Sequence, residues 1–189
     1  MDIIKKLAQE LAIKEEQAKA AVQLIDEGNT IPFIARYRKE MTGALNDETL
    51  RNLHERLLYL RNLEEKKEQV INAITDQGKM TEDLKKKILS AETLVAVDDL
   101  YRPYRPKKQT RATKAKEKGL EPLANILLLQ KTTKSMEEEA AAFVNAEKGV
   151  ANAKEAIAGA KDIIAEMIAD MADYRKSIRN CTMKQGSLV

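Results

Sequence analysis

The sequence predicts an all-α protein, an elongated multi-helix array with a helix-turn-helix-like lobe at the N-terminus and one long helix. Apolar residues recur at helical spacing along most of the 189 residues. Only 7 Gly and 4 Pro are present, too few turn-forming residues for a sandwich or barrel of many strands. The chain is 43% hydrophobic and 33% charged with few aromatics, a composition typical of exposed, amphipathic helices.

Four consecutive segments are expected along the chain. Residues 1–45 form a three-helix, helix-turn-helix-like lobe, and residues 46–101 form a long helix followed by short helices. Residues 102–118 form a basic strap, and residues 119–189 form a C-terminal helical lobe. The sequence stops at Val189 just after a turn, so we expect a fragment of a longer protein.

Three short helices are expected in the first lobe because apolar residues recur there at spacings of three and four. Gly28 stands where a left-handed helix stop is expected. Thr30 is expected to cap the third helix, with Pro32 in its first turn, where a missing N–H costs nothing. This helix ends in basic residues, so the lobe is either a helix-turn-helix with a basic helix or a three-helix lobe with a solvated basic end.

A long helix is expected over residues 47–77, because no Gly or Pro interrupts the sequence between a capping Asn46 or Asp47 and Gly78. At ~1.5 Å per residue it would be about 46 Å long. Its leucine stripe fades after two heptads, which favours a packed helix over a dimeric coiled coil. The stripe consists of Leu50, Leu53, Leu57, Leu60 and Leu63.

Two further elements precede the basic strap. Thr81 is a good helix start for residues 84–90, with acidic residues in the first turn. The apolar run over residues 93–101 fits either a buried strand or a short helix, which periodicity cannot separate.

The basic strap carries eight positive charges against the single carboxylate of Glu117. Aromatic and cationic residues alternate over residues 101–108, and Pro103 and Pro106 exclude regular helix there and hold the backbone extended. Such a strap suits a phosphate backbone, with a tyrosine stacked on a base. The alternatives are a structural strap whose cations meet acidic faces of the fold, and a protein contact.

The C-terminal lobe is expected to be helical throughout. Helices are expected over residues 121–129, from a capping box at Ser135 and Glu138 to about residue 143, over residues 152–171, and over residues 173–181. Small residues in the third of these, Ala156, Gly159 and Ala160, allow a neighbouring helix to approach closely.

Composition argues against several functional classes. The 33 basic and 30 acidic residues leave a net charge of +3, so any basic site must be local. One Cys excludes an internal disulfide and a Cys-rich zinc site, and one His, His54, leaves little for nucleophilic catalysis. Asp98 and Asp99 superficially resemble metal-holding carboxylates, but no third carboxylate or phosphate loop supports them, so a helical, non-catalytic pair is expected. We expect no enzyme activity, cofactor, metal or membrane span, and a cytoplasmic location.

Five segments of the sequence are distinctive in combination. The first covers residues 28–45 (GNTIPFIARYRKEMTGAL), and the others lie at residues 100–107, 111–113, 118–124 and 158–166. Together they resemble the N-terminal region of the Tex family of bacterial transcription accessory proteins. The resemblance implies a helical region that precedes an RNase H-like domain, a helix-hairpin-helix element and an OB-fold module for RNA.

The resemblance and the basic segments together predict a non-catalytic module that contributes to nucleic-acid binding, to RNA polymerase association, or to both. The expected partners are RNA or DNA bound without sequence specificity, RNA polymerase, and downstream domains of the same protein. The rival interpretation is an intramolecular helical scaffold that docks on those domains without contacting nucleic acid. The candidate nucleic-acid-binding residues are Arg36, Arg38, Lys39, Arg102, Tyr104, Arg105, Lys107, Lys108 and Arg111.

Overall fold

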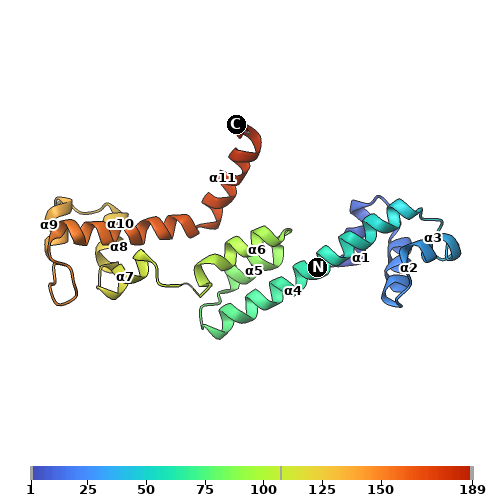
Figure 1. Ribbon diagram of the computed structural model, residues 1–189, viewed down its shortest axis with the longest axis horizontal. Coiled ribbons are helices and arrows are strands. Elements are labelled where there is room, and N and C mark those ends of the chain that lie inside the picture. Colours follow the sequence, from blue (N-terminus) through green and yellow to red (C-terminus); the bar gives the residue numbers. More distant parts are fainter. Residues whose placement is uncertain (1, 107, 188–189) are drawn as a thin grey trace. The chain divides into compact units, whose positions relative to one another are not determined.

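The computed structural model describes residues 2–106 and 108–187 and is all-α, as predicted (Figure 1). In this part of the chain there is no β-strand, and an isolated antiparallel bridge joins Asn145 and Val150. The chain divides into two compact units, residues 1–97 and 98–189, and the boundary falls inside one helix. No helix in the described ranges is long and apolar enough to cross a membrane.

The first unit is built on one long helix, α4, which α1, α2, α3 and α5 contact. All five leucines of the predicted stripe of α4 are buried, and the first four share one core cluster with the three short helices before it, so both the helix and its inner face are confirmed. The elements of this unit are α1 (Ile3–Glu10), α2 (Glu15–Asp26), α3 (Ile31–Tyr37), α4 (Asp47–Asp76), α5 (Glu82–Ser90) and the first half of α6 (Leu94–Tyr101).

Beyond the stripe, α4 buries a charged residue where the apolar pattern fades. Lys67 is 3% exposed, and its ammonium group donates to Glu64 Oε1 at 2.9 Å and to the carbonyl oxygen of Leu89 at 2.9 Å. Leu89 lies in α5, so this bond links the two helices. Because a buried ammonium needs partners, the lysine stem fills the stripe position while its charge is satisfied at the edge.

Most helix ends follow the predicted signals. Gly28 has a φ of +85° after α2, and Asn46 accepts a hydrogen bond from the Thr49 N–H at 2.7 Å. Thr30 precedes α3 as expected, but its side chain makes no capping hydrogen bond. Pro32 accounts for part of this difference, because it holds the second helical position and has no N–H to donate.

The ambiguous run over residues 93–101 is helix α6, not a strand. The Thr93 hydroxyl accepts from the Ala96 N–H at 3.2 Å, and the Leu94 N–H donates to the Tyr59 hydroxyl at 3.2 Å. Two donors at the start of the helix are therefore satisfied by side chains, one of them contributed by α4.

The central helix of the second unit is α10, and α7, α8 and α9 pack against it (Figure 1). At Gly159, α10 packs closely against α7 and the start of α8, because an added Cβ would overlap Leu120 Cδ1 and lie 3.2 Å from Ala115 Cβ. The predicted close approach is therefore confirmed. The elements are the second half of α6, the 3₁₀ turn η1 (Arg102–Tyr104), α7 (Arg111–Glu117), α8 (Glu121–Leu129), α9 (Met136–Ala141), α10 (Ala153–Asp170) and α11 (Ala172–Gln185).

Candidate nucleic-acid interface

The basic residues of the first unit lie at the exposed end of α3 and in the turn that follows it. Arg36 is in the last turn of the helix, and Arg38 and Lys39 begin the turn over residues 38–44. All three side chains are exposed, and among the described residues no carboxylate lies within ion-pair distance of them. Their charges are therefore available to an anionic partner.

The turn behind these residues is held by a glutamine from α2. Gln17 Nε2 donates to the carbonyl oxygens of Thr42 and Gly43, at 3.2 and 2.9 Å. Gln17 Oε1 accepts from the Lys14 N–H at 3.1 Å, so one side chain caps α2 and fixes the turn. Gly43 has a φ of +61°, a conformation that other residues adopt only with strain.

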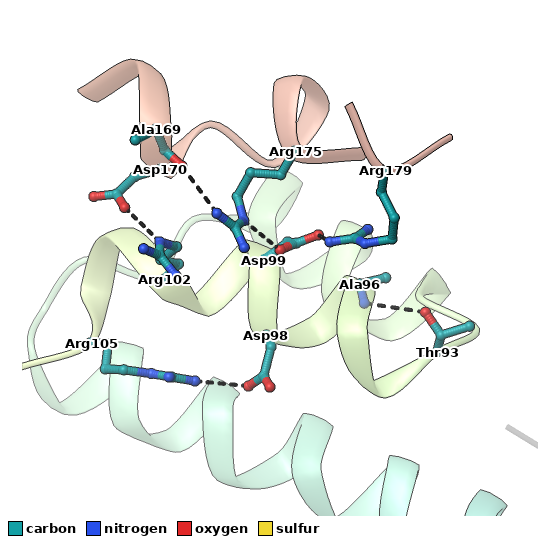
Figure 2. A network of polar contacts seen from close by, with 10 residues as sticks. All are labelled: Thr93, Ala96, Asp98, Asp99, Arg102, Arg105, Ala169, Asp170, Arg175 and Arg179. Atoms are coloured by element: carbon teal, nitrogen blue, oxygen red, sulfur yellow. Dashed lines mark hydrogen bonds and ion pairs between the residues drawn. The ribbon is translucent and has the colours of Figure 1, made fainter. Parts of the chain in front are cut away.

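The front of the basic strap is paired with carboxylates of its own unit (Figure 2). Arg102 Nε lies 2.9 Å from Asp170 Oδ1, and Arg105 Nη2 lies 2.9 Å from Asp98 Oδ1. The Arg105 guanidinium also lies 5.5 Å from the centre of the Tyr101 ring. These contacts are the acidic-face pairing that the structural alternative for the strap requires.

The backbone at the front of the strap differs from the expected extended path. Residues 102–104 form the 3₁₀ turn η1, and extended geometry begins only at Arg105, with φ of −66° and ψ of 133°. Pro103 permits this, because a proline near the first turn of a helix gives up no hydrogen bond and its fixed φ suits the turn. Tyr104 is half-buried.

A buried carboxylate on α6 binds two arginines of α11, a role that we did not predict from the sequence (Figure 2). Asp99 is 5% exposed, and its two oxygens accept from Arg175 Nε and Arg179 Nη2, each at 2.7 Å. Burial alone would raise the pKa of Asp99, but the hydrogen bonds and charges of the two arginines outweigh it and lower that pKa. A signal was present, because Arg175 and Arg179 are one helical turn apart and can bracket one carboxylate.

The carboxylate pair of α6 is helical, as predicted, and its two members serve different partners. Figure 2 shows Asp98 and Asp99 on different sides of the helix, each meeting separate arginines. The described residues contain no group of three or more His, Cys, Asp or Glu side chains that could hold a metal ion. The geometry of this pair therefore gives no support to a shared metal site.

The rear of the basic strap is more open. Thr110 caps α7 by accepting from the Thr113 N–H at 3.0 Å, and its hydroxyl lies 2.8 Å from Glu166 Oε2 of α10. Lys108 and Arg111 are exposed, and in the described ranges neither has a carboxylate within ion-pair distance. Lys107 lies outside the described residues.

A groove of about 270 Å³ lies between α7 and α10. Arg111, Lys114 and Lys118 line it from the basic strap, and Glu155 and Asp162 line it from α10. Charges of both signs therefore face the groove. The ammonium of Lys118 donates to the carbonyl oxygen of Gly149 at 2.7 Å, which ties the end of α7 to the turn before α10.

The nine candidate residues are divided between the two units. Three lie together at the end of α3, and the rest belong to the second unit. Within the basic strap, Arg102 and Arg105 are ion-paired, whereas Lys108 and Arg111 extend into solvent.

Two family models match the chain. The model of the Tex-like protein N-terminal domain covers residues 1–75, and the Tex central region-like model covers residues 131–189. The chain is 48% identical over 183 residues to "Protein YhgF" of Escherichia coli, an alignment that covers 97% of the chain and 24% of that protein.

Other relatives carry more informative names. "Transcriptional accessory protein Tex" of Neisseria gonorrhoeae is 45% identical over 180 residues, which is 95% of the chain and 23% of that protein. The human "S1 RNA-binding domain-containing protein 1" is 32% identical over 186 residues, which is 97% of the chain and 18% of that protein. The chain spans about a quarter of the length of its bacterial relatives. It belongs to the Tex family, whose N-terminal domain and central region it matches.

Proposed function

We propose that this region is a non-catalytic module of a transcription accessory protein that contributes to nucleic-acid binding. The observation that carries the proposal is that five exposed candidate cations have no carboxylate within ion-pair distance among the residues that the structure describes: Arg36, Arg38, Lys39, Lys108 and Arg111. The proposal is also supported by relatives whose names contain transcriptional accessory protein and S1 RNA-binding domain. The ligand is RNA or DNA contacted through its phosphates, without base reading.

The ion pairs at the front of the basic strap limit what this segment contributes to nucleic-acid binding. Arg102 and Arg105 each retain about half of their exposure, so they can add long-range attraction while their hydrogen bonds serve the fold. Tyr104, half-buried, offers less ring surface for stacking than a fully extended strap would provide. We therefore assign the direct phosphate contacts of this segment to Lys108 and Arg111.

A salt titration of the 189-residue chain tests the proposal. The logarithm of the affinity for a fluorescent oligonucleotide should fall linearly with the logarithm of salt concentration. Replacing Lys108 and Arg111 by Gln should reduce the slope by about 1.4 for a single strand, since each phosphate neutralised by the protein accounts for ~0.7. Lys85→Gln with Lys86→Gln removes two exposed charges from α5 and should leave the slope unchanged. No binding at about 50 mM salt would contradict the proposal.

RNA polymerase is the second partner that we propose, because transcription accessory proteins act where the polymerase is. Polymerase and nucleic acid both imply the cytoplasm of a bacterial cell. Co-sedimentation of the chain with polymerase, repeated after nuclease treatment, separates direct protein association from association that nucleic acid bridges. If nuclease treatment abolishes the co-sedimentation, polymerase is not a direct partner.

An intramolecular scaffold is the alternative favoured by a specific observation, the pairing of Arg102 with Asp170 and of Arg105 with Asp98. In that role the region docks on the remaining three quarters of a Tex-family protein. It predicts that the chain binds that remainder, supplied as a separate polypeptide, and does not bind nucleic acid at low salt. The two functions therefore differ in the nucleic-acid result, which is binding for the module and no binding for the scaffold.

A further inference from the structure

We propose that the end of α3 is a binding surface for single-stranded nucleic acid, with a base stacked on Tyr37 and the neighbouring cations on phosphates. The surface, here called the α3 surface, consists of Phe33, Arg36, Tyr37, Arg38 and Lys39. This inference rests on the proposed function and deepens it, because it names the form of nucleic acid and the residue that stacks.

Two aromatic rings at the α3 surface are exposed. Tyr37 is 60% exposed and Phe33 is 37% exposed, although both belong to a helix whose Ile34 is fully buried. Their ring centres are 5.3 Å apart with the planes inclined at 43°. Large apolar side chains left exposed together on one helix face mark a binding site more often than isolated ones do.

The cations beside these rings suit a polyanion. Residues 31–44 contain three cations, Arg36, Arg38 and Lys39, against one carboxylate, Glu40. The Arg38 guanidinium lies 5.3 Å from the centre of the Phe33 ring, and its Nη1 donates to the Tyr37 carbonyl oxygen at 3.4 Å. Arg38 therefore covers one aromatic ring and leaves Tyr37 as the exposed stacking surface.

The α3 surface is also fixed in position. Thr42 is fully buried, and its N–H donates to the Arg38 carbonyl oxygen at 3.2 Å. Gln17 holds the same turn from α2 through the bonds to Thr42 and Gly43 described above. A ligand that binds here need not order the backbone first, which lowers the entropic cost of binding.

The residue types favour a single strand over a duplex. A helix that reads the major groove presents polar side chains such as Asn, Gln and Arg to base edges. Helix α3 has seven residues, IPFIARY, of which only Arg36 can donate to a base edge through a charged group. Stacking requires an unpaired base, whose face any aromatic side chain accepts with little sequence preference.

Tyr37→Ala is the direct test, read as binding of the 189-residue chain to a fluorescent oligo(dT). We expect an affinity loss of about tenfold, since one base loses the ring on which it stacks. The slope of the salt dependence should not change, because no charge is removed. Tyr37→Phe should retain binding, and Tyr174→Ala, which removes a 52% exposed tyrosine from α11, should leave it unchanged.

The cations of the surface give the opposite signature. Replacing Arg36 and Lys39 by Gln should lower the affinity and reduce the salt slope by about 1.4 for a single strand. Charge and stacking contributions are thereby measured separately on one surface.

A second measurement places the base on the ring itself. The chain contains no Trp, so Tyr37→Trp introduces a single indole fluorophore at the surface. Oligo(dT) should quench its emission at saturation, and a duplex of the same length should not. This variant keeps an aromatic ring at the position and so does not depend on the folding of Tyr37→Ala.

The outcomes separate the inference from the proposed function. If the chain binds oligo(dT) but neither Tyr37→Ala nor the Trp emission responds, the stacking surface is wrong and the proposed function stands. A preference for duplex over single strand would also overturn the inference, in favour of a groove-binding helix. If the unaltered chain binds no nucleic acid at all, both proposals fail.

Discussion

Replacing Gly159 by alanine tests how closely α7 and α10 approach each other. Gly159 lies inside α10 with no positive φ, so at an exposed position the same change would stabilise the helix by about 1 kcal/mol. Here the new methyl group would overlap Leu120 Cδ1 and lie 3.2 Å from Ala115 Cβ. Two effects of opposite sign therefore compete at one residue.

The surroundings of Leu120 decide whether Gly159→Ala stabilises or destabilises the second unit. Leu120 is 1% exposed, so its side chain cannot turn aside into solvent and must displace buried neighbours. Overpacking of this kind costs ~1–3 kcal/mol, which exceeds the gain in helix propensity in most of that range. We expect Gly159→Ala to destabilise the second unit by about 1 kcal/mol, and Gly159→Val by more, because a branched side chain adds further volume and lowers helix propensity.

The assay must report on one unit, because the two units need not unfold together. Native-state hydrogen exchange of α10 amides gives the free energy of opening of that helix. Adding Leu120→Ala to Gly159→Ala should cost less than the sum of the two single changes, since the smaller side chain makes room for the methyl group. A Gly159→Ala protein that is stabilised by about 1 kcal/mol would refute the close approach.

Three further changes test polar contacts that hold the fold. Asp99→Asn should lower the free energy of opening of α11 by about 2 kcal/mol, measured as faster exchange of its amides. The reason is that it removes a carboxylate that accepts two charged hydrogen bonds. Since the folded pKa of Asp99 lies below the unfolded value of 3.8, this stabilisation is complete above that pH and is lost as pH falls through the folded pKa. Lys67→Met should lower the stability of the first unit by about 1–2 kcal/mol, measured by urea denaturation, because it removes the donor to Leu89. Gln17→Ala should cost about 1 kcal/mol and speed amide exchange over residues 38–44.

Each of these changes has a matched control on the same or a neighbouring helix. The control for Asp99→Asn is Asp98→Asn, which alters an exposed ion pair and should cost under about 1 kcal/mol. The control for Lys67→Met is Lys85→Met, which alters an exposed lysine and should change stability by less than about 0.5 kcal/mol. The control for Gln17→Ala is Gln23→Ala, which removes a surface hydrogen bond to Glu27. If a control and its test variant behave alike, the buried contact is not the source of the stability.

Much of the fold follows from local signals. The long helix α4 was predictable because a capping residue and Gly78 bound a segment that contains no Gly or Pro and carries a leucine stripe. The run over residues 93–101 was not, because a short apolar stretch fits both a strand and a helix. Its helical form depends partly on the hydroxyl of Tyr59, which lies 35 residues earlier in the chain and reaches it only in the folded unit.

The candidate site was less predictable, because pairing of charges depends on contacts that sequence spacing does not reveal. Arg102 meets Asp170, a residue 68 positions away, and nothing local connects them. The near balance of 33 basic and 30 acidic residues indicated that many cations form ion pairs with carboxylates of the same chain. The basic end of α3 could be identified from the sequence, because its charged residues are close together in the chain.

The attachment of α11 has a consequence for how this part of the molecule responds to its surroundings. No residue of α11 is buried, and the helix is held by two guanidinium groups on the carboxylate of Asp99. A helix that is held by ion pairs can detach and rebind while the hydrophobic core stays intact, because the movement exposes no large apolar surface. The two arginine–carboxylate contacts, rather than apolar packing, therefore control the position of this helix.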